Sequence, residues 1–113
     1  MSEEIGNTIA EGAQNEFFIS VFDYRSETLQ FMESNQLQGG GATWMGLITA
    51  ALEIESPVTL SAINFDDESD EVVVSSASKA ALTVVQSYVS LLMSDRFFME
   101  QCIERGNQNG YLE

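Results

Sequence analysis

The sequence contains no histidine, one cysteine, one proline and only four lysine or arginine residues among its 113 positions. Without histidine, the chain lacks the side chain that most often serves as a general base or metal ligand and that titrates near neutral pH. The single cysteine, Cys102, cannot form a disulfide within the chain. Because it stands among Phe98, Met99 and Ile103, we expect a buried thiol that acts as a small hydrophobic side chain. No apolar run approaches the roughly 20 residues of a membrane-spanning helix.

Negative charge is what the chain has in excess. Eighteen Asp and Glu residues give a formal net charge of −14, yet 44% of the residues are hydrophobic. Disordered acidic segments are poor in apolar residues, so this composition predicts a folded domain with an acidic surface. Such a surface repels nucleic acid and anionic membranes and attracts basic partners. The first fourteen residues have neither the basic stretch nor the apolar region of a secretory signal, so we expect a cytoplasmic protein.

The first clear element is a strand at residues 15–24 that is apolar on both faces. Ile19 and Val21 lie on one face of this strand, and Phe18 and Phe22 lie on the other. A strand of this kind is usually interior to its sheet and covered on each side. The cover can come from helices or from a second subunit.

The rest of the chain predicts helices on either side of a β-hairpin. In order, we expect helices at 26–37 and 43–56, strands at 62–65 and 72–76, and helices at 78–93 and 94–105. The fold class is therefore α+β: a small antiparallel sheet of about three strands packed with about four helices, in the order strand-helix-helix-hairpin-helix-helix. We expect a single domain over residues 15–106, after a flexible lead-in at 1–14 and before a tail at 107–113.

Two features at the start of the second helix suggest sites. The triplet Gly39–Gly41 resembles a phosphate cradle, but no lysine follows in the P-loop position, no strand immediately precedes it and the acidic field repels phosphate. A flexible turn between helices is the favoured interpretation. For Trp44 the alternatives are a binding anchor and a buried ring that fixes the helix on the sheet, and the buried ring is favoured.

Five carboxylates fall within six residues between the two hairpin strands: Asp66, Asp67, Glu68, Asp70 and Glu71. They do not form an EF-hand, because no glycine stands at the sixth position of the loop and Ala77 stands at the twelfth. The run is either a solvated turn or a candidate partner-binding site, and both alternatives stay open. No catalytic group emerges, since the serines have no histidine to activate them and nothing singles out one pair of carboxylates. We expect no enzymatic activity, no cofactor and no metal.

Two short motifs frame this region. A glycine-rich turn leads to a tryptophan that opens a helix, at Gly40, Gly41 and Trp44. Further on, a Phe-Asp pair ends a strand before a tight turn and a second strand, at Phe65 and Asp66.

Together with the alanine-leucine helix that begins at residues 78–82, these motifs resemble the immunity protein 51 family, small inhibitors encoded beside bacterial polymorphic toxins. The resemblance covers residues 39 to about 105. The chain departs from the family pattern at Thr43, where an acidic residue is common. It departs again at Asp67 and Asp70, in a turn that usually carries proline and glycine.

The resemblance implies an immunity protein that binds a cognate toxin and neutralises it by covering its active surface. A basic nuclease domain would suit the charge, because its substrate cleft is basic and an acidic inhibitor can occupy it. The alternative is a small acidic secretion chaperone, often dimeric, that holds an effector before export, so a homodimer is left open. Under either interpretation the partner is a protein, and neither nucleic acid nor a membrane is expected.

Overall fold

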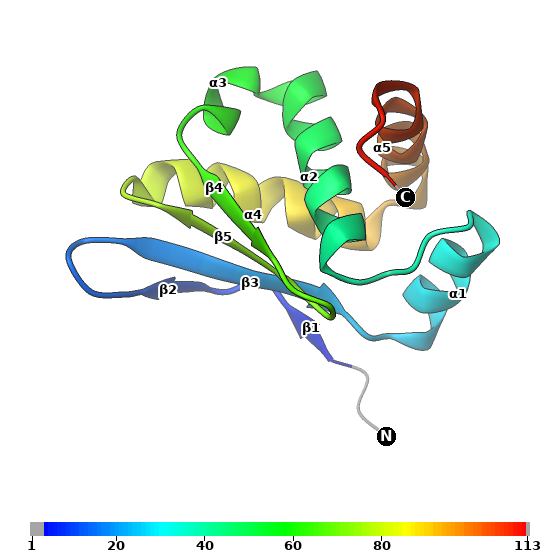
Figure 1. The fold of residues 1–113 in the computed structure, drawn as a ribbon, viewed down its shortest axis with the longest axis horizontal. Helices are drawn as coiled ribbons and strands as arrows, with labels where there is room; N and C mark the ends of the chain where they lie inside the picture. Colours follow the sequence, from blue (N-terminus) through cyan, green and yellow to red (C-terminus); the bar gives the residue numbers. More distant parts are fainter. Residues whose placement is uncertain (1–3, 113) are drawn as a thin grey trace.

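The computed structural model describes residues 4–112 and has the predicted α+β fold (Figure 1). One antiparallel sheet contains β1 (Ile5–Gly6), β2 (Ile9–Glu11), β3 (Phe17–Asp23), β4 (Asn64–Asp67) and β5 (Val72–Ser76). The helices are α1 (Ser26–Ser34), α2 (Gly41–Glu55), α3 (Pro57–Leu60), α4 (Lys79–Ser94) and α5 (Arg96–Asn109). Within the described residues, no helix has the length and apolar character needed to cross a bilayer.

The strand order is β1-β3-β5-β4, and β2 also pairs with β3. β1 and β2 are two parts of one edge strand, because the register is the same on both sides of the gap: Gly6 faces Phe22 and Ile9 faces Ile19. On its other edge β3 pairs with β5, which forms a hairpin with β4. β3 is therefore interior to the sheet, as its apolar pattern predicts.

Residues 5–11 form strands where the sequence predicts a flexible lead-in. In the gap between β1 and β2, the Asn7 side-chain amide donates to the Gln86 carbonyl oxygen (3.1 Å) and to Ser90 Oγ (2.8 Å) of α4. The Gln86 amide donates back to the Asn7 carbonyl oxygen at 2.9 Å. Pairing with β3 and these bonds order a segment whose own apolar pattern is weak. Residues 1–3 of the predicted lead-in lie outside the described residues.

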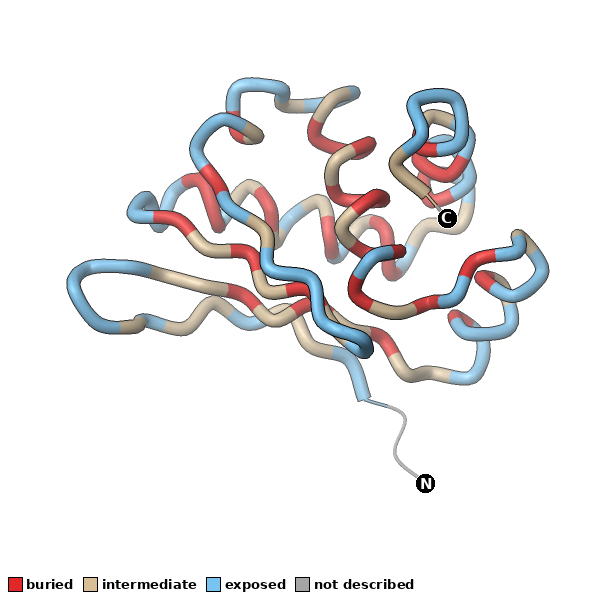
Figure 2. Tube along the Cα trace, viewed as in Figure 1, coloured by how far each residue is buried: buried red, intermediate tan, exposed pale blue. Residues whose placement is uncertain are grey.

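The helices cover only one face of the sheet. In Figure 1, α2 and α4 lie above and behind the strands, and α5 packs on both of these helices. Four apolar residues of β3 and β5 are completely buried: Ile19, Val21, Val72 and Val74. Buried and half-buried residues alternate along both strands, as the change of colour along the tube shows (Figure 2). The sequence predicts cover on both sides of β3, but no described element covers the opposite face.

The C-terminal end is also more ordered than predicted. The sequence predicts that the last helix ends at residue 105, with the following Gly106 as its stop, but α5 continues to Asn109 and Gly110 ends it in the left-handed conformation, with φ of +75°. Gly106 is buried, and an added Cβ there would lie 2.8 Å from the side chain of Leu112. The glycine therefore makes room for the returning chain, and Leu112 packs against the core. Part of the predicted tail thus belongs to the folded domain.

Candidate partner-binding surface

The acidic turn (residues 66–71) comprises the last two residues of β4 and the short connection to β5. The Glu68 N–H donates to the Glu71 carbonyl oxygen at 2.8 Å, which closes the turn. Asp66, Asp67, Glu68 and Asp70 are exposed, and Glu71 is half-buried. Like charges held at this spacing repel one another, so the turn carries an unfavourable electrostatic energy that a cationic partner would relieve.

The glycine turn packs directly against the acidic turn, a contact that the sequence does not predict. The Gly41 N–H donates to the Ser69 carbonyl oxygen at 3.3 Å. A Cβ added to Gly41 would lie 2.1 Å from the Glu68 carbonyl oxygen, and one added to Gly40 would lie 2.1 Å from that of Ser69. The glycines are therefore more than a flexible helix–helix turn, because they let the start of α2 approach the turn closely and hold its backbone in place.

The five carboxylate residues do not all face the same way. Asp66 pairs with Val73 and so lies on the sheet face away from the helices, whereas Asp67 pairs with the buried Val72 and lies on the helix side. Asp67 and Glu68 line a shallow hollow beside the glycine turn. A second hollow is lined by Asp70. The acidic turn thus presents negative charge to more than one side of the molecule.

Tyr24 links the acidic turn to the N-terminal segment. Its hydroxyl donates a long hydrogen bond of 3.4 Å to the Asp70 carbonyl oxygen, and its N–H donates to the Glu4 carbonyl oxygen at 2.7 Å. Burial, followed by the negative charges of Asp70, Glu71 and Glu4, raises the pKa of the Tyr24 hydroxyl. Sequence reasoning missed Tyr24 and Glu4 because only the folded sheet brings Tyr24 beside Asp70, which is 46 residues away, and Glu4 beside Tyr24.

Charge is distributed unevenly over the two sides of the molecule. Residues 4–24 and 61–78, which form the sheet and its turns, contain nine Asp or Glu residues and no Lys or Arg. The four basic residues all lie in helices or next to one: Arg25, Lys79, Arg96 and Arg105. Arg25 is 2.8 Å from the buried Asp23 carboxylate, and Arg105 is 3.6 Å from Glu53. The cations therefore leave most of the negative charge of the sheet side uncompensated.

Trp44 is fully buried, which confirms the favoured interpretation of this residue. It lies in the first turn of α2 within the core between helices and sheet, and it is not a surface anchor. Its indole N–H has no hydrogen-bond partner in the described structure, so packing alone holds the ring.

Cys102 is also completely buried, as predicted. Burial, with a smaller contribution from Glu55, raises the pKa of its thiol to about 12. A thiol of this kind stays protonated near neutral pH and is a poor nucleophile. Within the described residues, no group of three or more Cys, Asp or Glu side chains is arranged to hold a metal ion.

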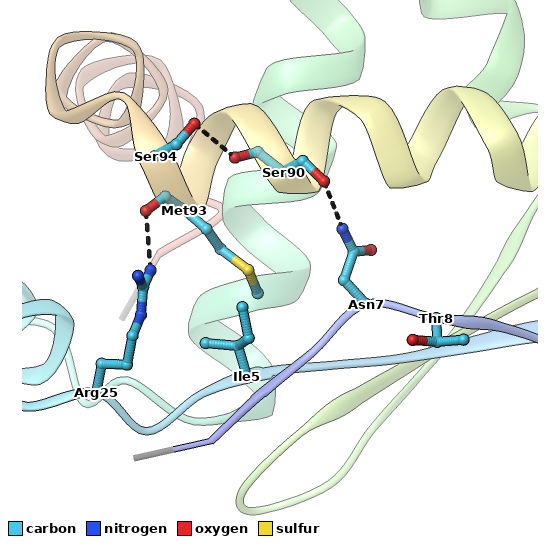
Figure 3. Close-up of a pocket in the computed structure, with 7 residues that line it drawn as sticks. All are labelled: Ile5, Asn7, Thr8, Arg25, Ser90, Met93 and Ser94. Atoms are coloured by element: carbon cyan, nitrogen blue, oxygen red, sulfur yellow. Dashed lines mark hydrogen bonds between the residues drawn. The ribbon is translucent and has the colours of Figure 1, made fainter.

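A hollow of about 390 Å³ lies between β1 and the C-terminal part of α4 (Figure 3). It is lined by Ile5, Asn7, Thr8, Arg25, Ser90, Met93 and Ser94. Arg25 donates to the Met93 carbonyl oxygen at 3.0 Å, and Asn7 donates to Ser90 Oγ. In Figure 3, Asn7 and Arg25 both point toward α4, so Asn7 holds the N-terminal segment on the helix layer and Arg25 holds the connection after β3 there.

Comparison with known protein families shows which family the chain belongs to. The chain matches the model of the family described as immunity protein 51 over residues 8–108, from just before β2 to the last turn of α5. It belongs to the immunity protein 51 family. No curated protein and no solved structure matches it. The match begins well before residue 39, where the resemblance of the motifs begins, and so includes β2 and β3.

The motif residues divide between the acidic turn and the core. Gly40 and Gly41 contact the turn backbone, Trp44 lies in the core and Phe65 packs against the core. Asp66 is the exposed member of the set. A partner-binding role for the five carboxylates remains a prediction. Gly40 and Gly41 shape the turn, whereas Trp44 and Phe65 belong to the packing of the core.

Proposed function

We propose that this protein binds a cognate toxin and neutralises it by covering the toxin's active surface, and that the covered surface is basic. Membership of the immunity protein 51 family is the observation that carries the proposal. The net charge of −14 favours a basic partner, because a negatively charged surface attracts a basic protein. The protein acts by binding and not by catalysis, and it acts in the cytoplasm of the cell that must be protected.

The negative charge speeds the association of the inhibitor with a basic toxin. Complementary charge raises association rate constants from about 10⁵–10⁶ to as much as about 10⁸–10⁹ M⁻¹s⁻¹ at low salt. Rapid capture suits an inhibitor that must reach the toxin before the toxin reaches its target. A nuclease domain fits this description well, because its substrate cleft is basic and an acidic surface can occupy that cleft.

The acidic turn is a suitable contact because it is held in place before the partner arrives. The bond between Glu68 and Glu71 closes the turn, and the glycines of the preceding loop pack on its backbone. Little conformational entropy is then lost on binding. Arginine or lysine side chains of the toxin would relieve the repulsion among the carboxylates and form charge-assisted hydrogen bonds, which are stronger than neutral ones.

A secretion chaperone is the alternative that the charge alone allows. Such a protein needs an apolar groove for its effector, whereas an inhibitor needs a charged complementary surface. The family match favours the inhibitor. Self-association is not required by the proposal.

Co-expression with the toxin domain encoded by the neighbouring gene tests this proposal. The wild-type chain should restore growth and form a complex that can be isolated from the cells. In the turn variant, Asp66, Asp67, Glu68, Asp70 and Glu71 are replaced by Asn or Gln. Its affinity should fall at least about tenfold, or about 1.4 kcal/mol, because charge-assisted contacts are lost. Removing like charges should leave the fold as stable as the wild type or slightly more stable.

The matched control removes the same number of charges from exposed helix positions: Glu27, Glu33, Glu55, Glu100 and Glu104, each replaced by Gln. It should keep affinity within about threefold, because it changes net charge without touching the turn. Absence of both protection and complex with the wild-type chain would overturn the proposed function. Equal affinity of the turn variant and its control would show that the turn is only solvated.

A further inference from the structure

The face of the sheet away from the helices carries apolar side chains on its inner strands, β3 and β5, although no described element covers it. The register places its side chains in rows across the strands. One row runs through Ala10, Phe18, Ser75 and Asn64, the next through Ser20, Val73 and Asp66, and a third through Gly6 and Phe22. We call these residues, with Tyr24 and Glu4 at one end, the open face. A solvated face of an antiparallel sheet normally carries polar side chains, so Phe18, Phe22 and Val73 are unexpected there.

These apolar side chains are not part of the core. Phe18, Phe22, Tyr24 and Val73 are all half-buried, and none of them is among the partly buried side chains that pack against the core. Partly exposed apolar side chains bordered by polar residues are typical of interaction sites in monomeric proteins. The open face therefore has the composition of an interface.

The aromatic rings lie flat on the sheet. A Cβ added to Gly6 would lie 2.1 Å from a ring carbon of Phe22, so this ring rests directly on the glycine of the neighbouring strand. Tyr24 stacks on Phe22, with the ring centroids 4.8 Å apart and the ring planes at 25°. Rings arranged in this way offer a broad aromatic surface, and the face of an aromatic ring attracts the ammonium or guanidinium group of a cation.

Carboxylates border the aromatic surface on two sides. Asp66 shares a row with Val73, and Glu4 lies on the same face because it continues the register of β1 opposite Tyr24. Asp70 adjoins Tyr24 from the acidic turn. No lysine or arginine occurs in the strands or their turns, so this negative border has no cation of its own.

The negative charge of the open face favours a basic protein over a second copy of the chain as its occupant. In a symmetric dimer through this face the same carboxylates would meet across the interface with no cation between them, and their repulsion would oppose the contact. A basic protein surface has the opposite charge. The aliphatic stems of its lysine and arginine side chains can also cover apolar surface while their heads reach the carboxylates.

We infer that the open face is the floor of the toxin-binding surface, and that basic side chains of the toxin lie across Phe22 and Tyr24 with their charged groups against Asp66, Asp70 and Glu4. This inference rests on the proposed function and adds to it the surface that the toxin covers. The acidic turn then forms one edge of a larger interface.

A pair of lysine substitutions at the centre of the open face tests the inference. Ser20→Lys with Ser75→Lys places two cations among the half-buried serines of this face, where each long side chain can still reach water. The control is Gln30→Lys with Gln101→Lys, at exposed positions of α1 and α5, which changes the net charge equally. We expect the affinity for the neighbouring-gene toxin domain to fall at least about tenfold in the first pair and to stay within about threefold in the control. Equal affinities in the two pairs would overturn the inference.

Hydroxyl-radical footprinting of the wild-type complex gives the same test without substitution. Phe18, Phe22 and Tyr24 should lose reactivity when the toxin domain binds, while Phe97 on α5, which is 68% exposed, should remain reactive. Protection of Phe97 alone would place the toxin on the helices and overturn the inference, although the proposed function would stand. Protection of the open face in the free protein at high concentration would indicate a second copy as the occupant. If the wild-type chain forms no complex at all, the proposed function and the inference fall together.

Discussion

Replacing Gly41 with alanine tests whether the contact between α2 and the acidic turn depends on the absence of a side chain. The added Cβ would lie 2.1 Å from the Glu68 carbonyl oxygen and 2.2 Å from the Glu71 carbonyl oxygen. Both oxygens are backbone atoms of a closed turn, so the turn must move away from α2 as a unit. The hydrogen bond from the Gly41 N–H to Ser69, 3.3 Å in the wild-type structure, is then lengthened or lost.

The expected loss of stability follows from three contributions. Overpacking of this kind costs about 1–3 kcal/mol. Loss of one backbone hydrogen bond adds about 0.5–1.5 kcal/mol. Alanine is favoured over glycine inside a helix by about 1 kcal/mol, which offsets part of the cost. We therefore expect Gly41→Ala to lower the free energy of unfolding by about 1–3 kcal/mol and to weaken toxin binding, because the turn is displaced.

Urea denaturation followed by circular dichroism measures this free energy. Ala42→Gly is the matched control, because Ala42 is exposed in the same helical turn and its replacement changes only helix propensity, by about 1 kcal/mol. If Gly41→Ala is as stable as the wild type, the close approach does not require glycine, and the role given to the glycine turn is wrong.

Two further predictions concern the core and the ion pair between Arg25 and the buried Asp23. Trp44→Ala should lower the free energy of unfolding by about 3–5 kcal/mol, which is the usual cost of emptying a buried aromatic site. A variant that folds normally but no longer binds its partner would contradict the buried role of Trp44. Burial alone would raise the pKa of Asp23, but the hydrogen bonds from Arg25 and Thr28 outweigh it and lower that pKa. The ionised carboxylate therefore stabilises the fold above the unfolded-state pKa of about 4, and this contribution is lost as the pH falls through the lower folded-state value. Asp23→Asn should thus be less stable than the wild type at pH 7 by about 1.5–3 kcal/mol, and a difference that does not shrink on acidification would contradict this reasoning.

The elements that sequence reasoning found are those with a strong local pattern. The apolar stripe of α2 from Trp44 to Leu52, the two-sided strand β3 and the hairpin strands beside the acidic turn all carry their signal in their own residues. β1 and β2 carry little such signal, because Ile5 and Ile9 are their only large apolar residues. These two strands form because they pair with β3. Edge strands of this kind are specified by the partner strand more than by their own sequence.

The roles of glycines are even harder to predict from the sequence. A glycine that ends a helix and a glycine that makes room for another chain segment look alike in sequence. Gly106 is predicted to end α5 but instead gives space to Leu112, and Gly110 provides the left-handed end. The packing of Gly41 on the acidic turn is hidden for the same reason, since it joins segments that are distant in the chain.

The candidate site was only partly visible in the sequence. The run from Asp66 to Glu71 stands out by composition. Composition does not show that Asp66 and Asp67 lie on opposite faces, or that Tyr24 adjoins the turn with Glu4 beside it. The apolar second face of β3 was visible as Phe18 and Phe22. That no helix of the described structure covers this face is a property of the tertiary arrangement.

The most direct test of the central claim is the association rate of the purified chain with its neighbouring-gene toxin domain, measured by stopped-flow fluorescence from low to physiological salt. Electrostatic capture of a basic toxin predicts a saturable complex whose association slows steeply as salt rises, well before dissociation accelerates. The turn variant should show a shallower salt dependence than its helix control. An association rate that is flat across this range would contradict capture by the acidic surface, and no detectable association would contradict the toxin-binding function itself.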